Sequence, residues 1–147
     1  GDVYKRQQLG GTILLSKQIM NIYKKQNYGN LVLLSSIQGI SAPKFEHYKG
    51  TQMSSPIEYG AIKSGIISIT KYLAKFVKNT KIRVNCVSPG GIFDKQPAKF
   101  LKAYKASCNS KGMLNPHDVS NTIIFLCSNQ STYINGQNII VDDGWSL

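Results

Sequence analysis

The sequence predicts an α/β fold in which helices cover a parallel sheet. Three short apolar runs have the composition of strands buried on both faces, and segments with helical periodicity lie before and between them. The resulting order of helix, strand, helix, strand, helix, strand indicates right-handed crossovers and a parallel sheet. Sheets usually contain about five or six strands. We therefore expect this chain to form the second half of something larger.

The first helix and strand are expected in the first third of the chain. Apolar residues recur at nearly helical spacing over residues 9–25, and the segment 28–30 ends this helix, with Gly29 free to take the left-handed cap conformation. The apolar run 31–34 ends in two serines and predicts a strand. A loop rich in Gly, Ser and Pro then extends from residue 39 to about residue 56.

The clearest helical pattern covers residues 57–78. Its apolar side chains fall at steps of three and four and form one stripe that includes Ile62, Ile66, Ile69 and Leu73. The β-branched run 82–87 predicts the second strand, which Ser88-Pro89-Gly90-Gly91 closes.

The last third of the chain should hold short helices and one more strand. The mixed stretch 93–113 suggests one or two short helices. Asn115 is a good N-cap, with Pro116 at the first helical position, so a helix should start there. Residues 138–141 predict the last strand.

The composition is that of one globular domain. Of the 147 residues, 41% are hydrophobic and 17% are charged, which argues against disorder. Apolar runs are far shorter than the roughly 20 residues of a membrane span, so we expect no membrane association. The three cysteines are widely spaced, which excludes a disulfide scaffold and gives no metal-site spacing. A reducing, cytoplasmic setting is the simplest interpretation.

The net charge of +11 permits two interpretations. It suits a nucleic-acid-binding module, but sixteen of the eighteen basic residues are Lys, and they are scattered along the chain. We therefore favour a solvated lysine-rich surface and expect no nucleic-acid partner. A negatively charged small substrate would also suit this balance.

Tyr59 and Lys63 are the first candidates for chemistry. They lie four positions apart on one face of the predicted helix, and an ammonium beside a phenol favours the phenolate. Tyr59 is therefore a candidate acid/base, whereas Tyr48 has Gln52 where its lysine would stand. The serine pair and the 88–91 turn end neighbouring strands, so they should lie at the same edge of the sheet.

Together these motifs resemble the classical short-chain dehydrogenase/reductase family over about residues 8–147. The motifs are Gly29–Ser36, Tyr59–Lys63, Arg83–Gly91 and Tyr133–Trp145. The resemblance implies the C-terminal half of a Rossmann-like, doubly wound parallel sheet, with the N-terminal nucleotide-binding half missing. It also implies oxidation of an alcohol, or reduction of a ketone, with NAD or NADP as cofactor.

The resemblance also assigns roles to individual residues. Tyr59 would be the acid/base, Lys63 would lower its pKa and hold the nicotinamide ribose, and Ser36 would be the catalytic serine. Both Tyr59 and Lys63 thus belong to the cofactor site as well. Three more positions match the segment that contacts the nicotinamide end of the cofactor: Pro89, Gly90 and Ile92.

Three features depart from the family pattern. Gln8 stands where the family has a catalytic Asn, and residues 1–7 suit the expected helix poorly, so we interpret them as foreign sequence. Tyr59 follows Ser36 by 23 positions, which is longer than usual. The extra loop, residues 45–56, should sit over the site, with His47 as a loop residue. The family's substrate lid corresponds to residues 93–113.

The resemblance extends to partners and to a subgroup. The extra loop and the segment that follows the second strand resemble those of bacterial reductases linked to surface-sugar or flagellin-glycan modification. This resemblance implies a sugar-derived alcohol or ketone as substrate. Pairing through helices 8–25 and 57–78 would give a homodimer or homotetramer. An epimerase or dehydratase of the extended branch, which shares the Tyr and Lys, is the alternative enzyme. We expect the 147-residue chain alone to be inactive.

Overall fold

The computed structural model describes residues 2–147 and confirms the predicted α/β class. Within these residues the sheet has three parallel strands in the order β1-β2-β3. The strands are β1 (Gly29–Leu34), β2 (Ile82–Pro89) and β3 (Asn138–Val141). β3 has the predicted bounds, whereas β1 and β2 each extend two residues beyond the predicted runs.

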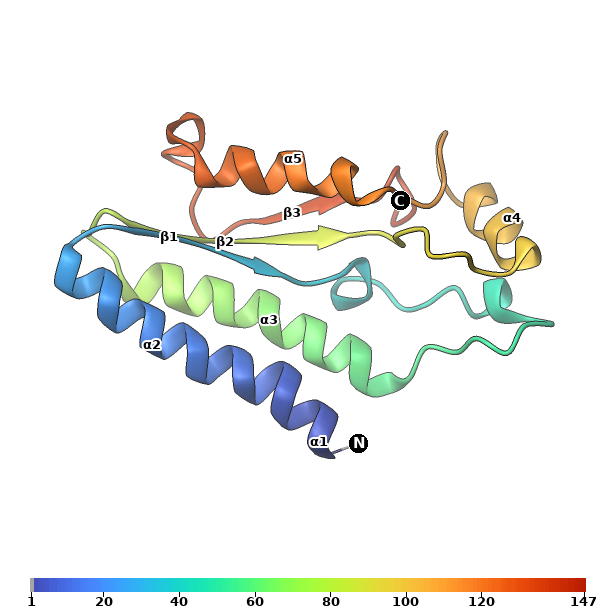
Figure 1. The fold of residues 1–147 in the computed structure, drawn as a ribbon, viewed down its shortest axis with the longest axis horizontal. Coiled ribbons are helices and arrows are strands. Elements are labelled where there is room, and N and C mark those ends of the chain that lie inside the picture. The colour runs from blue at the N-terminus through green and yellow to red at the C-terminus, as the bar shows by residue number, and fades with distance from the viewer. Residues whose placement is uncertain (1) are drawn as a thin grey trace.

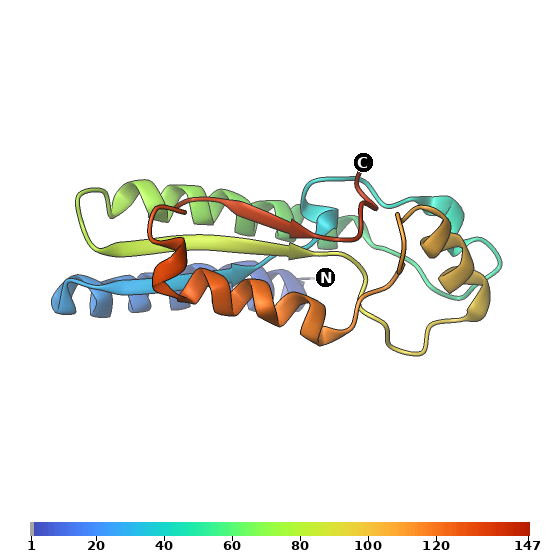
Figure 2. The same cartoon turned by 90° about the horizontal axis from the view of Figure 1, so that it is seen from above.

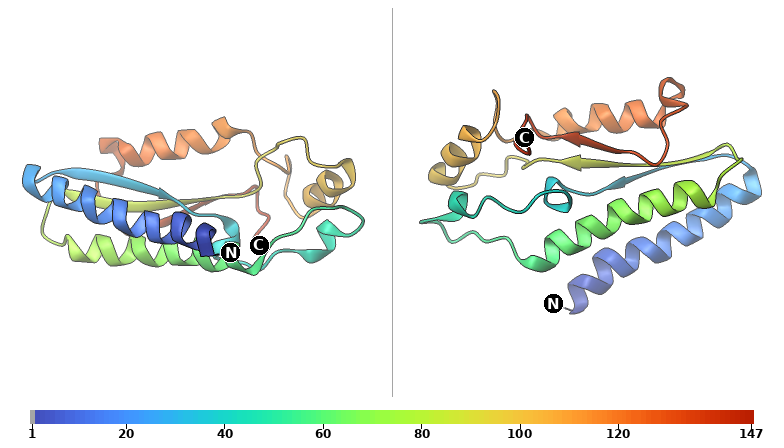
Figure 3. Two further views of the ribbon diagram at one scale, coloured as in Figure 1. Left: turned by 60° about the horizontal axis from the view of Figure 1, so that its bottom comes forward. Right: turned by 180° about the vertical axis from the view of Figure 1, so that it is seen from behind.

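Helices cover both faces of the sheet. Helices α2 (Gly11–Gln26) and α3 (Ile57–Phe76) lie side by side on one face, and α5 (Pro116–Cys127) lies on the other (Figures 1 and 3). Helix α4 (Ala98–Ala106) lies beyond the carboxyl ends of the strands, next to the segment around residues 45–48 (Figure 2). This end of an open parallel sheet is where ligands bind.

The first helix differs from the prediction at both of its ends. Helix α1 (Asp2–Lys5) and a wider π-helical turn at Arg6–Gly10 continue directly into α2, so residues 2–7 are helical, contrary to the poor fit expected. The side chains of residues 3–8 are exposed, so this turn adds little to the core. Residue 1 lies outside the described residues, and a foreign origin of residues 1–7 stays a prediction.

Gly29 is not the left-handed cap of α2, and that prediction was wrong. Asn27 takes the left-handed conformation instead, with φ of 56°. Asn tolerates this conformation because its short polar side chain can hydrogen-bond locally. Gly29 already belongs to β1, where an added Cβ would lie 2.1 Å from the Tyr23 ring. Glycine is therefore needed at this position for close packing.

The hydrophobic core lies between the sheet and its helices. The central strand β2 is the most buried element, and Val84, Cys86 and Val87 are fully buried in it. The predicted stripe of α3 packs against this strand, with Ile62 and Ile66 buried beside Cys86. Val119 and Leu126 of α5 cover the opposite face at Val87. Burial on both faces explains why the strands are so uniformly apolar.

Helix α5 begins as predicted. Asn115 is its N-cap, Pro116 is its first residue, and the Asn115 backbone N–H donates to Asp118 Oδ2 over 2.7 Å. A carboxylate at this end also favours the positive end of the helix dipole. The stretch 93–113 forms a single helix, α4.

One arginine attaches the far end of α5 to the sheet. The Arg83 guanidinium, on β2, donates hydrogen bonds at 2.8–3.2 Å to backbone carbonyls at and just after the end of α5. The four carbonyls belong to Leu126, Ser128, Ser131 and Ile134. These contacts help to fix the chain between α5 and β3.

Candidate functional site

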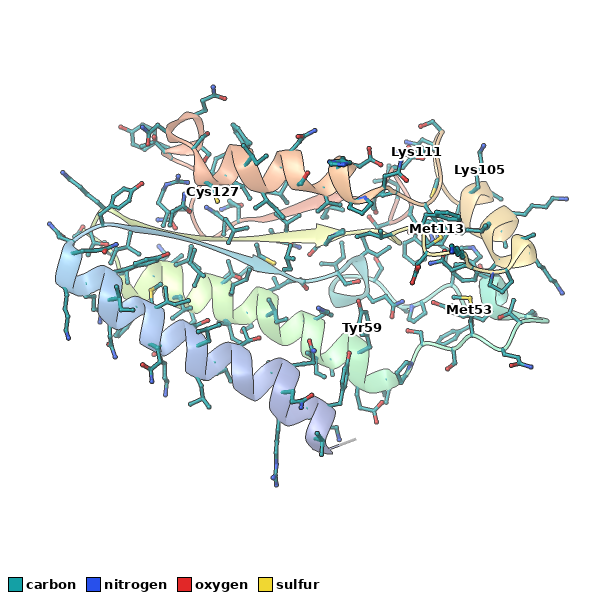
Figure 4. All side chains as sticks on the ribbon, in the orientation of Figure 1. Met53, Tyr59, Lys105, Lys111, Met113 and Cys127 are labelled. Carbon is teal, nitrogen blue, oxygen red and sulfur yellow. The ribbon has the colours of Figure 1, made fainter. Side chains whose placement is uncertain are left out.

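A cavity of about 500 Å³ opens at the carboxyl ends of the strands. Its walls come from the turn after β1, the inserted segment, the start of α3, the turn after β2, α4 and the C-terminal turn. Figure 4 labels three of the lining side chains, Met53, Tyr59 and Met113, on the side of the molecule that carries α4. Six predicted site residues line it: Ser36, Tyr59, Lys63, Pro89, Gly90 and Ile92.

Hydrogen bonds from serine hydroxyls to backbone carbonyls hold the turn after β1 against α3. Ser35 Oγ donates to the Lys63 carbonyl, and Ser64 Oγ donates to the Gly39 carbonyl, each over 2.7 Å. An added Cβ on Gly39 would lie 2.8 Å from the Lys63 carbonyl carbon, so only glycine permits this approach. The contacts fix Ser36, at the start of the turn, relative to the helix that carries Tyr59.

The Ser36 hydroxyl is positioned by its own turn. Ser36 is 8% exposed, and its Oγ accepts a hydrogen bond from the Gln38 backbone N–H over 3.1 Å. Within residues 2–147 the structure gives this hydroxyl no acceptor of its own. Since a hydroxyl has one donor besides its lone pairs, Ser36 can donate to a ligand oxygen in the cavity.

Lys63 lies one turn after Tyr59 on α3. Its Nζ is 5.5 Å from the centroid of the Tyr59 ring. Burial lowers the pKa of Lys63, and the nearby Cys86 opposes that shift. The ion pair found among the described residues is elsewhere, between Lys111 and Asp118. A half-buried ammonium with no carboxylate beside it can bind neutral hydroxyl groups.

The turn after β2 forms another wall of the cavity. Gly90 N–H donates to the Val141 carbonyl over 2.8 Å, and Gly91 N–H donates to Tyr104 Oη over 2.6 Å. An added Cβ on Gly90 would lie 3.0 Å from both Asp142 and Tyr104 Oη, so a side chain there would crowd its neighbours. Burial raises the pKa of Tyr104 to about 12, and its phenol therefore stays neutral.

The structure does not bring Gln8 into this cavity. Gln8 lies in the π-helical turn at the start of the chain, and its side chain is exposed. Its carbonyl accepts a hydrogen bond from Thr12. The role of Gln8 at the family's Asn position therefore stays a prediction.

The inserted segment, residues 45–56, lines the cavity as expected. It contributes His47, Tyr48 and the run from Met53 to Pro56. His47 is 4% exposed, so it is a packed core residue of the loop.

Sequence reasoning missed several lining residues. Gln38 lies just beyond the first motif and Trp145 lies at the end of the last one, but no spacing rule singled out either residue. Trp145 is 3% exposed, and within residues 2–147 its indole N–H has no hydrogen-bond partner. The one available signal for Gln38 was its place two residues after Ser36.

Residues 2–147 contain neither a cluster of metal-ligating side chains nor a membrane-spanning helix. No group of three or more His, Cys, Asp or Glu side chains lies close enough together to hold a metal ion. Among the helices of the same residues, none is both long and apolar enough to cross a bilayer.

Comparison with known proteins identifies the family. A family model described as enoyl-(acyl carrier protein) reductase matches residues 6–146. The flagellin modification protein A of Campylobacter coli is 50% identical over 139 residues, and the match covers 95% of this chain. The chain belongs to the short-chain dehydrogenase/reductase family.

Other members of the short-chain dehydrogenase/reductase family agree in sequence and fold. A 7alpha-hydroxysteroid dehydrogenase of Bacteroides fragilis is 35% identical over an alignment of 144 residues, and the match covers 95% of this chain. The crystal structure of a short chain dehydrogenase from Leptospira borgpetersenii with bound NAD+ is 37% identical, with a TM-score of 0.87 over 95% of this chain.

The chain spans about half the length of these short-chain dehydrogenases/reductases. It covers 54% of the Campylobacter protein, 52% of the Bacteroides protein and 54% of the Leptospira chain. Its three-stranded sheet with flanking helices therefore corresponds to about half of a Rossmann-like domain.

Proposed function

We propose that this chain is the C-terminal part of an NAD(P)-dependent oxidoreductase that interconverts an alcohol and a ketone. The observation that carries the proposal is the convergence of Ser36, Tyr59 and Lys63 on one cavity at the carboxyl ends of the strands. The family membership supports it, and so does the NAD+ bound to the similar Leptospira dehydrogenase.

Each of the three residues has a distinct task in this proposal. In the reducing direction the Tyr59 phenol gives a proton to the carbonyl oxygen of the substrate, and in the oxidising direction the phenolate takes it back. Ser36 donates a hydrogen bond to the same oxygen and stabilises the charge that develops on it. The Lys63 ammonium places a positive charge 5.5 Å from the centroid of the Tyr59 ring, where it stabilises the negative charge that develops as the phenol gives up its proton. When bound, the nicotinamide coenzyme supplies or accepts the hydride.

The residues present suit the nicotinamide half of such a coenzyme. The Lys63 ammonium has no carboxylate beside it in the described structure, so it can bind the ribose hydroxyls. Pro89, Gly90 and Ile92 line the cavity next to it and would contact the nicotinamide end. Either NAD or NADP agrees with these residues.

The substrate we propose is a sugar or a sugar-derived alcohol or ketone. The relative that is 50% identical is a flagellin modification protein, and polar side chains such as Gln38, Ser54 and Gln96 line the cavity. We expect the full-length protein to act in the cytoplasm.

We propose that the full-length protein pairs through α2 and α3. The outer faces of these helices expose large apolar side chains, among them Leu14, Leu15 and Tyr72, each more than 60% exposed. Pairing would remove these side chains from water and give a homodimer or homotetramer.

The test measures hydride transfer by the full-length protein. The absorbance of NADH or NADPH reports the rate. We expect Tyr59→Phe to lower kcat about 100-fold or more, since it removes the proton donor and keeps the ring. Tyr133→Phe is the matched control, because Tyr133 is 98% exposed and does not line the cavity. A Tyr59→Phe enzyme with wild-type kcat would contradict the proposal.

A further inference from the structure

Three polar side chains form a connected group in the cavity wall beside Ser36. Gln38, Tyr48 and Ser55 all line the cavity. Ser55 Oγ donates a short hydrogen bond to Gln38 Oε1. Gln38 Nε2 lies 3.5 Å from Tyr48 Oη, which is at the long limit for a hydrogen bond. The Gln38 amide therefore has a hydrogen-bond partner at its oxygen and only a distant one at its nitrogen.

This arrangement leaves hydrogen-bond donors available to a ligand. Ser55 already donates to the amide oxygen of Gln38, whereas the NH2 group carries two donors and has only the 3.5 Å contact with Tyr48 Oη. Within residues 2–147 the Tyr48 hydroxyl has no other partner, and a phenol also donates one hydrogen bond. The group therefore suits an acceptor oxygen on the substrate.

The inserted segment supplies both partners of Gln38. Tyr48 packs against Phe100 of α4, with 5.2 Å between ring centroids, which anchors the phenol to the segment predicted as the substrate lid. Ser55 directly precedes Pro56, the N-cap of α3, so it is fixed to the helix that carries Tyr59. The inserted segment therefore contacts the Gln38 amide at both its oxygen, through Ser55, and its nitrogen, through Tyr48.

Gln38 lies close to the residues expected to bind the reacting carbonyl. Its backbone N–H donates to Ser36 Oγ, so the amide extends from the turn that carries the serine expected to bind the reacting oxygen. An added Cβ on Gly60 would lie 3.1 Å from the Gln38 carbonyl, so this turn also lies directly on the α3 residue that follows Tyr59.

We propose that the Gln38 amide is a specificity-determining group that binds an oxygen substituent on the carbon next to the reacting carbonyl. Ser55 is a positioning residue, because it orients the amide and leaves its NH2 free. The inference rests on the proposed oxidoreductase function and deepens it. The substrate class is an α-hydroxyketone, or the vicinal diol formed from it, in preference to a ketone flanked only by hydrocarbon.

The experiment measures how the full-length enzyme, supplied with either coenzyme, turns over two small probe substrates. Hydroxyacetone and 2-butanone differ in that a hydroxyl of the first is replaced by a methyl in the second. We expect kcat/KM to favour hydroxyacetone in the wild type. Gln38→Met, which keeps the length of the side chain but removes the amide, should lower that preference about 10-fold, the value of one hydrogen bond near 1.4 kcal/mol.

Two variants of Ser55 distinguish a positioning role of this residue from a non-specific loss of activity. Ser55→Ala should lower the preference in the same direction, and Ser55→Thr, which keeps a hydroxyl, should restore it. Gln52→Met is the matched control, because it makes the same chemical change on the inserted segment at an exposed residue outside the cavity.

The outcomes distinguish this inference from the function on which it rests. If the wild type turns over both probes without preference, or if Gln38→Met keeps the full preference, the inference is overturned while the oxidoreductase function stands. If the wild type turns over neither probe with either coenzyme, the proposed function fails and this inference fails with it.

Discussion

His47 Nε2 lies 2.9 Å from Ser107 Oγ, and this contact joins the inserted segment to the residue that caps the end of α4. The imidazole lies close to three aromatic rings, with centroid distances of 5.9–6.3 Å: Phe100, Tyr104 and Trp145. Two segments far apart in the sequence are therefore packed together over the site cavity.

His47→Ala should destabilise the full-length protein. It removes a buried ring from an aromatic cluster as well as the hydrogen bond to Ser107, so we expect the free energy of unfolding to fall by about 2–4 kcal/mol. Urea unfolding at neutral pH measures this loss. His117→Ala, at an exposed histidine, is the control, and equal effects of the two substitutions would refute the role of His47.

The same histidine should make stability depend on pH. Burial lowers the pKa of His47 below 6.5; Glu46 opposes this shift and Lys44 adds to it. The unfolded chain therefore binds the proton first, so the stabilising contribution is complete above pH 6.5 and is lost as the pH falls below it. Unfolding midpoints at pH 7.5 and 5.5 should differ more for the wild type than for His47→Asn. Equal differences would exclude His47 as the cause.

Asp143 should hold the segment after α4 against the C-terminal turn. Its carboxylate accepts backbone hydrogen bonds at 2.6–3.0 Å from Ser110, Lys111 and Gly112, and these bonds lower its pKa to about 2. We expect Asp143→Asn to speed hydrogen exchange at these three amides, because an amide side chain accepts more weakly than a carboxylate.

The pH dependence of this contact has a defined sign. The pKa of Asp143 is lowered in the folded state, so its stabilisation is present above the ordinary aspartate value near 3.8 and is lost as the pH falls toward about 2. Asp94→Asn is the control for hydrogen exchange, since Asp94 is exposed. Unchanged exchange at residues 110–112 in Asp143→Asn would contradict the prediction.

Arg83→Lys should destabilise the connection between α5 and β3. A lysine cannot reproduce the planar fork that reaches four carbonyls, so we expect a loss of about 1–3 kcal/mol in the free energy of unfolding. Lys81→Met, at an exposed neighbour, provides the comparison. A loss no larger than that of Lys81→Met would show that the fork is not required.

Local periodicity and capping residues were sufficient to predict the elements and some of their ends, such as the start of α5, but not every cap. The stripe of α3 and the apolar strands were predicted because burial on one or both faces leaves a repeating pattern. The residue that caps α2 was not predicted: Asn27 takes the left-handed conformation, and Gly29 is required instead by the Tyr23 ring that packs onto β1. Contacts of this kind depend on how elements pack and leave no local signal.

The residues of the candidate site also fall into two groups, those predicted from the sequence and those seen only in the structure. Ser36, Tyr59 and Lys63 could be found because strand ends and helix spacing predict which edge or face a residue occupies. Gln38 and Trp145 were not predicted, because their places in the cavity wall depend on how the turn after β1 and the C-terminal turn pack.

By itself the sequence determined the alternation of strands and helices and the candidate site residues Ser36, Tyr59 and Lys63, since each follows from local spacing along one element. Only the tertiary structure decided which side chains surround these candidates. It showed the aromatic packing of His47, the hydrogen bond from Ser55 to Gln38 and the exposed position of Gln8. The physical reason is that these contacts join residues whose separation in space is set by packing and loop closure, which no periodicity records.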